Sequence, residues 1–150
     1  MEYQTYSSST EAEATDLFQQ EVLVYGNFWE RFLAALIDGV ILIIPNLFLG
    51  LIVDGIESSL ISIAIGWIYY ASMESGKSQA TFGKRAMGLK VTDLNANPIS
   101  FGQATARHFG KYLSMLILFI GYLMMLWDDK SQTLHDKMAN TLVIKNRTSW

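Results

Sequence analysis

Apolar residues gather in three long stretches, and polar residues fill the segments between them. The stretch 32–53 has 22 residues and one charge, Asp38. As an α-helix it would span roughly 33 Å, enough to cross the ~30 Å hydrocarbon core of a bilayer. The second stretch, 56–73, contains only the charge of Glu57, and the third, 112–127, contains none. Because a chain of 150 residues cannot bury three such helices inside itself, the pattern predicts an integral membrane protein.

The distribution of basic residues predicts the orientation. The connection at Asp54 and Gly55 has no Lys or Arg, whereas the segment 75–111 has six. The positive-inside rule places this segment and the N-terminus in the cytoplasm, and the Asp54 turn outside. The tail after residue 127 also holds basic residues, so two alternatives stay open: the third stretch crosses fully, or it breaks and turns back.

Two short segments, Leu89–Thr92 and Leu142–Lys145, have the composition of strands, and they can pair only on one face of the membrane. The expected fold is therefore an all-α membrane protein. It is a small bundle of about three hydrophobic helices, with a short cytoplasmic β element between the second and third. A flexible acidic segment, 1–24, precedes this membrane domain, 25–147.

Composition excludes several classes of function. The net charge of −3 provides no basic excess for nucleic acid. The chain has no Cys, and its two His, His108 and His135, lack metal-binding spacing, so we expect no metal site. No nucleophile–base pair is evident, so we expect neither an enzyme nor a cofactor.

Asp38 is the first candidate for chemistry. It lies about two turns inside the first apolar stretch, where a charge costs ~2.5–3.5 kcal/mol. Arg31, seven positions earlier, shares its helix face at roughly 10 Å along the axis, so direct contact needs a bridging group. Asp38 is then either a site for a proton, cation or charged ligand, or a structural anchor between helices. Arg31 alone could equally serve only to set the topology.

Four motifs then follow one another along the chain. They are Phe28–Asp38, Gly76–Val91, Pro98–Ser100 with Arg107 after it, and Leu134–Lys137 with Thr141–Val143. Together they resemble the signature of the RDD family of membrane proteins, over about residues 25 to 145. The family takes its name from one Arg and two Asp. The resemblance implies that Arg31 is the Arg and Asp38 the first Asp, with Asp136 preferred over Asp128 and Asp129 as the second.

The resemblance implies a fold more firmly than a function. The family is suspected of transport, and some members resemble cation/proton antiporters. Our first hypothesis is a small transport protein of the inner membrane, in which Asp38 alternates between a proton and a monovalent cation or other small ligand. Asp136, with His135 beside it, would lie at the cytoplasmic surface near Arg31 or Arg107. Lys84 and Arg107 are supporting bases.

Three helices enclose no pathway, so transport predicts a homo-oligomer or a partner membrane protein within the lipid bilayer. The second hypothesis is a membrane-embedded adaptor of a larger complex. In that case Arg31, Asp38 and Asp136 would only fix helix packing, and the segment from Thr81 to Lys111 would dock a partner or anionic lipid.

Overall fold

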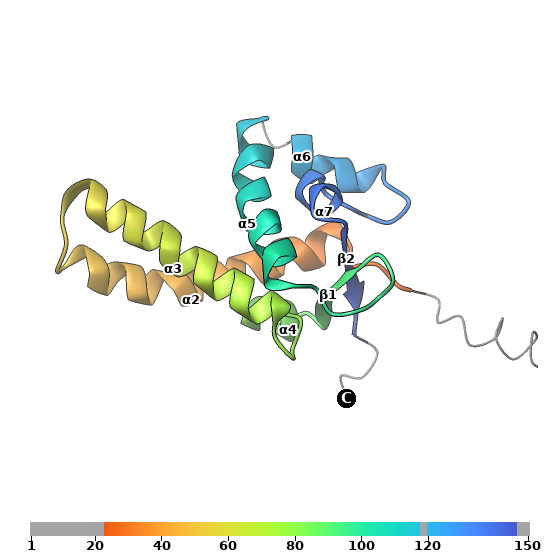
Figure 1. The fold of residues 1–150 in the computed structure, drawn as a ribbon, viewed down its shortest axis with the longest axis horizontal. Coiled ribbons are helices and arrows are strands. Elements are labelled where there is room, and N and C mark those ends of the chain that lie inside the picture. Colours follow the sequence, from red (N-terminus) through yellow and green to blue (C-terminus); the bar gives the residue numbers. More distant parts are fainter. Residues whose placement is uncertain (1–22, 118–119, 147–150) are drawn as a thin grey trace, which may run out of the picture.

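The computed structural model describes residues 23–117 and 120–146 and shows helices around a two-stranded sheet (Figure 1). The long helices α2 (Phe28–Gly50) and α3 (Gly55–Ser75) form a hairpin. The elements that follow are α4 (Phe82–Ala86), β1 (Leu89–Asp93), α5 (Phe101–Leu116), α6 (Ile120–Leu123), the 3₁₀ helix η1 (Met124–Leu126), α7 (Leu134–Met138) and β2 (Thr141–Lys145).

Local sequence fixes where α2 begins. The Asn27 side chain accepts a hydrogen bond from the backbone N–H of Glu30 (2.9 Å), and the Glu30 carboxylate accepts one from the Asn27 N–H (3.0 Å). This reciprocal cap satisfies two amides that have no partner inside the helix. Ala34 and Asp38, one turn apart, are the buried residues of α2. They face α4, so a single narrow side of this helix is covered by protein.

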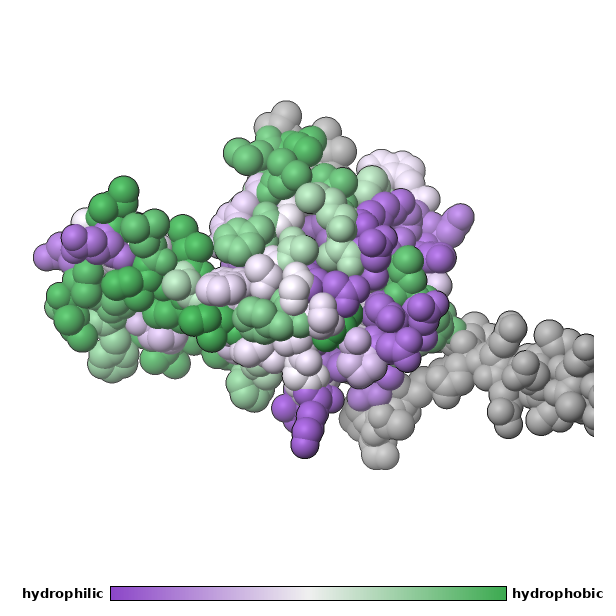
Figure 2. Space-filling view, viewed as in Figure 1, coloured by the Kyte–Doolittle hydropathy of each residue, from purple (hydrophilic) through white to green (hydrophobic). Residues whose placement is uncertain are grey.

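The part of the hairpin remote from the sheet exposes apolar side chains. Among the described helices, α2 is the one long and apolar enough to cross a membrane by length and composition. Figure 2 shows apolar residues covering the hairpin, while hydrophilic residues gather around the sheet and α7. So extensive an exposed apolar surface indicates contact with a membrane or another protein. Apolar side chains at least 60% exposed in the hairpin include Val40, Ile44, Leu47, Phe48, Leu51, Ile52, Ile56 and Leu60.

The third apolar stretch, 112–127, does not form one helix. α5 begins well before it and ends inside it, and α6 and η1 contain most of the rest of its described residues. A Cβ added to Gly121 would lie 2.8 Å from the Cβ of Ser114, so the chain turns back to pack closely on α5. Of the two alternatives left open for this stretch, the structure therefore shows the break and not one continuous helix. Figure 1 shows α5 running across the direction of the hairpin rather than alongside it.

Both predicted strands are present, and they pair with each other. β1 and β2 are antiparallel, with Val91 opposite Val143 in the centre of the ladder. Tyr25, just before α2, adds an isolated bridge to Ile144. The sheet therefore connects the segment before α2, the segment after α4 and the end of the described chain, and it holds all three at the same end of the molecule.

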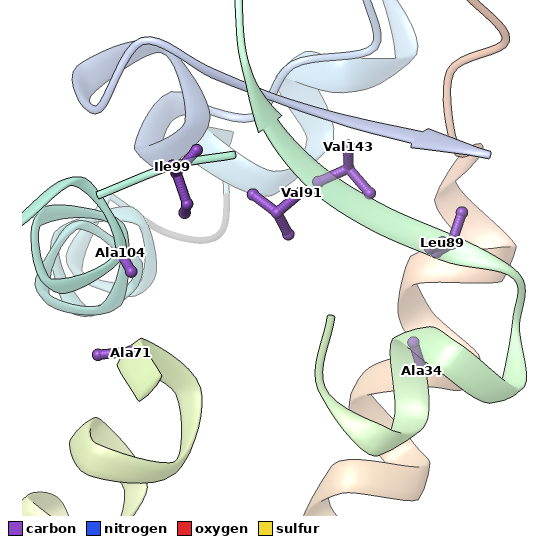
Figure 3. Packing of buried hydrophobic residues seen from close by; sticks show 7 residues of the cluster. All are labelled: Ala34, Ala71, Leu89, Val91, Ile99, Ala104 and Val143. Atoms are coloured by element: carbon purple, nitrogen blue, oxygen red, sulfur yellow. The ribbon is translucent and has the colours of Figure 1, made fainter. Parts of the chain in front are cut away.

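The apolar core lies where the sheet meets the bases of the helices (Figure 3). The strands contribute the large side chains Leu89, Val91 and Val143, whereas the helices contribute alanines that allow close approach of their backbones. Ile99 closes the cluster before α5 begins. The core alanines are Ala34 of α2, Ala71 of α3 and Ala104 of α5.

Gly83 sets the distance between α4 and α2. A Cβ at this position would lie 2.0 Å from the backbone oxygen of Ala34 and 2.9 Å from the Cγ of Asp38. Because a backbone atom cannot rotate out of the way, any side chain at residue 83 must push the two helices apart. The family-like motif around Gly83 therefore has a packing function.

We predict that Gly83→Ala lowers the free energy of unfolding by about 1–3 kcal/mol or more, because the new methyl group overpacks the contact between α2 and α4. The measurement is thermal unfolding in mild detergent. Gly39→Ala is the matched control, since a Cβ at Gly39 meets nothing within 4 Å and alanine favours the helix. Equal thermal midpoints for the two variants would contradict this account of the contact.

Candidate functional site

Five charged side chains meet in the interior, at the end of the hairpin nearest the sheet. Each comes from a different helix, so they converge only when the chain has folded. Three are basic and two are acidic, which leaves one net positive charge. This charged cluster consists of Arg31 of α2, Glu74 of α3, Lys84 of α4, Arg107 of α5 and Asp136 of α7.

Asp136 joins the two arginines of the charged cluster. Its Oδ2 accepts from Arg31 Nη1 and its Oδ1 accepts from Arg107 Nη1, each at 2.5 Å. Oδ2 also accepts from the backbone N–H of Thr133, which caps α7. Burial opposes ionisation of this carboxyl, but Arg107 and then Arg31 outweigh it and hold the pKa of Asp136 well below its usual range. Asp136 is therefore ionised at every physiological pH.

Glu74 forms the second acidic centre. Its Oε2 accepts from Arg107 Nε at 3.1 Å, and its Oε1 contacts the ammonium group of Lys84. Arg107 donates further to the Thr141 hydroxyl at 2.8 Å. Arg107 is 2% exposed and lies between both carboxylates, which makes it the centre of the charged cluster.

Asp38 is buried, and its hydrogen-bond partners do not include Arg31, the partner that the sequence suggested. Its carboxylate accepts from the Thr81 hydroxyl (2.6 Å), the backbone N–H of Gly83 (2.8 Å) and the Tyr69 hydroxyl (2.7 Å). Among the described residues, no hydrogen bond or ion pair joins Asp38 to Arg31. Asp38 therefore ties α2 to α3 and to the start of α4, a geometry that fits the structural alternative.

Arg31 uses its remaining donors on backbone oxygens. Nε donates to Gly26 O at 3.1 Å, and Nη2 donates to Ser131 O at 2.7 Å. Together with Asp136, these contacts join the start of α2 to the loop before α7. Arg31 thus contacts the segment 131–136, about a hundred residues away in the sequence.

His135, expected to support the site, is neutral. Burial lowers its pKa to about 3, against the attraction of Asp136. Its Nε2 lies 3.0 Å from the Thr133 hydroxyl, and its Nδ1 lies 3.4 Å from the Ser114 hydroxyl. The contact with Ser114 joins α7 to α5, and the contact with Thr133 lies within the start of α7, so His135 acts here as a packing residue.

A cavity of about 330 Å³ adjoins the charged cluster, lined mainly by α2 and α5. Four of the charged residues that line it are basic and one, Asp38, is acidic, because the carboxylates of Glu74 and Asp136 lie behind the wall. The wall is otherwise largely apolar and aromatic. Within the described ranges, no three His, Asp or Glu side chains are placed to hold a metal ion. The basic lining residues are Arg31, Lys84, Arg107 and Lys111.

Sequence reasoning missed Glu74 and Lys111. Glu74 comes directly after the apolar stretch 56–73, and Lys111 directly before the stretch 112–127. Charges at such boundaries usually mark a helix end at the membrane surface, so position in the sequence provides no signal for a buried role.

The model of the RDD family matches residues 25–140. The chain belongs to the RDD family. It is 31% identical to the uncharacterized protein YxaI of Bacillus subtilis (strain 168), covering 78% of this chain and 95% of that protein. It is 32% identical to a proline-rich antigen homolog of Mycobacterium tuberculosis (strain H37Rv), over 55% of this chain and 36% of that protein. No solved structure matches this RDD protein.

We predict that Arg31 and Asp136 are energetically coupled. Removing either one leaves a buried charge without its partner, at a cost of up to about 3–5 kcal/mol. The double variant Arg31→Ala/Asp136→Ala should therefore lose about 1–3 kcal/mol less than the sum of the two single variants. Thermal unfolding in one detergent and one salt concentration measures this difference.

The control cycle combines Arg31→Ala with Lys137→Ala. Lys137 pairs with Asp128 and is exposed, so these two losses should add. Additive losses in both cycles would show that Arg31 and Asp136 do not depend on each other.

Proposed function

We propose that this RDD protein is a multi-pass membrane protein that binds a small ligand in the cavity between α2 and α5 and takes part in its transport. The observation that carries the proposal is the cavity itself. It combines a charged wall with an apolar one, as ligand sites do. It also lies at the end of a hairpin whose exposed apolar surface suits a bilayer.

We infer that α2 and α3 cross the bilayer and that the sheet lies in the cytoplasm. The segment 75–111 holds six basic residues and the hairpin turn holds none, which supports a cytoplasmic N-terminus. Pairing of β1 with β2 keeps the end of the described chain on the same side as this segment. α5, running across the hairpin, then lies along the membrane surface, and the charged cluster lies at the cytoplasmic boundary.

The cavity supports an anionic ligand better than a monovalent cation. Its charged lining is four basic residues against Asp38, and one net positive charge remains once Glu74 and Asp136 are counted, which disfavours a cation. Asp38 already accepts three hydrogen bonds from fixed donors, which leaves little of its carboxylate to bind a cation. Exchange of a cation for protons on Asp38 therefore has less support than transport of an anionic solute.

Transport by this protein requires more than one copy or a partner membrane protein, because a single hairpin encloses no path across the bilayer. Binding without transport requires neither. If this protein binds a ligand but transports no solute, its function would instead be that of a membrane-embedded adaptor.

The topology is testable with single cysteines, because the chain has no native Cys. We expect Ser78→Cys, after α3, to react with a membrane-impermeant thiol reagent only in opened cells. Glu57→Cys, exposed near the hairpin turn, should react in intact cells. The reverse pattern would contradict the inferred orientation.

Transport is testable in proteoliposomes with sodium, potassium, inorganic phosphate and an alkyl phosphate as solutes. We expect an anionic solute to move faster than in protein-free vesicles, and the cations not to. Ala35→Trp should abolish this movement, because Ala35 lines the cavity and an indole fills it. Leu36→Trp, on the same helix but not among the residues that line the cavity, is the control and should keep it.

Sodium or potassium movement that depends on Asp38 would instead support cation exchange. Rates equal to those of protein-free vesicles for every solute would reject transport and favour the adaptor.

A further inference from the structure

We propose that the cavity binds an amphiphile with one anionic head group, and that the Lys111 ammonium contacts that head group while the apolar chain lies against α2 and α5. The inference rests on the ligand binding proposed above and names its chemical class. It assigns a recognition function to Lys111, which has no ion pair with either carboxylate of the charged cluster.

Lys111 is the basic lining residue without a carboxylate partner. The other three each contact a carboxylate of the charged cluster. Among the described residues Lys111 has no hydrogen bond or ion pair, and its Nζ lies 3.8 Å from the centroid of the Tyr70 ring. A cation over an aromatic face still has N–H groups free to donate. An anion in the cavity would supply the acceptors that the protein does not.

The ammonium is poorly stabilised as it stands. Burial lowers the pKa of Lys111 to about 8, although Glu74 partly opposes this effect. Lys111 is thus largely protonated at neutral pH but has lost much of its hydration. A carboxylate or phosphate beside the ammonium would replace the stabilisation that it lost with its hydration.

His108 offers a second unmet polar group in the same wall. It is 5% exposed, and its Nδ1 has no hydrogen-bond partner among the described residues. Burial, and then Lys111, lowers its pKa to about 4, so the ring is neutral. In the tautomer in which the Tyr112 hydroxyl donates to Nε2 at 3.4 Å, Nδ1–H is a donor without an acceptor. Lys111 and His108 are one turn apart on α5.

The rest of the wall suits a hydrocarbon chain. Phe28 and Phe32 of α2 face Met115 of α5 and Met125 of η1 around the cavity. Phe32 and Met115 are also 45% and 49% exposed, so the apolar wall continues onto the outer surface that α2 presents to lipid. A free inorganic anion would leave this wall without a partner, whereas an alkyl chain would cover it.

The test is equilibrium binding of radiolabelled dodecyl phosphate to the purified protein in nanodiscs of zwitterionic lipid. We expect saturable binding to the wild type. Lys111→Met keeps the length of the side chain and removes the charge, so it should weaken binding by about tenfold or more. Lys111→Arg keeps the charge and should restore binding to within a few-fold. Lys77→Met, at an exposed lysine outside the cavity, should bind like the wild type.

Competition defines the ligand class. Unlabelled dodecyl phosphate should displace the label, whereas inorganic phosphate and dodecanol at the same concentration should not. Displacement by phosphate alone would overturn the requirement for a chain, and displacement by dodecanol would overturn the requirement for charge. Equal weakening by Lys77→Met and Lys111→Met would reduce the effect to general attraction by a basic surface. Unligated thermal midpoints of all variants establish that each one folds.

Failure here is distinguishable from failure of the proposed function. If dodecyl phosphate does not bind but another anion moves across proteoliposomes and Ala35→Trp stops it, the ligand class is wrong and the transport proposal stands. If dodecyl phosphate binds through Lys111 but no solute moves, the site is real and the protein is not a transporter.

Discussion

One buried carboxylate, that of Asp136, organises this RDD protein. It receives Arg31 from the first described helix and Arg107 from α5, and it caps α7 at the same time. Ion pairs of this kind gain little net stability over an apolar core, because desolvation offsets most of the attraction. Their effect is specificity, since any arrangement that separates the partners leaves buried charges unpaired. The position of α2 relative to α5 and α7 is therefore strongly determined.

The charged cluster also determines the character of the cavity. Glu74 and Asp136 contact the bases from behind, so the basic groups form the wall and the acids do not. These contacts balance two of the three positive charges of Arg31, Lys84 and Arg107, whereas Lys111 contacts neither carboxylate. The wall of the cavity thus carries positive charge, and the carboxylates of Glu74 and Asp136 balance most of that charge.

The apolar core and the exposed apolar surface of the hairpin are built from different side chains. The core is small and built largely from alanines and strand residues near the sheet. The large aliphatic side chains of the hairpin point outward. This inversion is expected when lipid rather than water surrounds a helix, because lipid does not penalise exposed hydrocarbon. The exposed apolar surface of the hairpin therefore suits a bilayer, and the polar interior near the sheet depends on its hydrogen bonds and ion pairs.

The sequence by itself determined the features that local pattern controls. Apolar length predicted the helices now seen at 28–50 and 55–75, and composition predicted both strands. The motif residues Arg31, Arg107 and Asp136 were found as well, because family resemblance keeps their identity visible. Only the tertiary structure decided between the two alternatives for the third apolar stretch, because hydropathy does not register the close return that Gly121 allows. It alone buried Glu74, brought Lys111 to the cavity and gave Asp38 its partners on α3 and α4. Those contacts join residues 31 to 45 positions apart, and a charge at a helix end has the same local sequence whether it faces water or a buried partner.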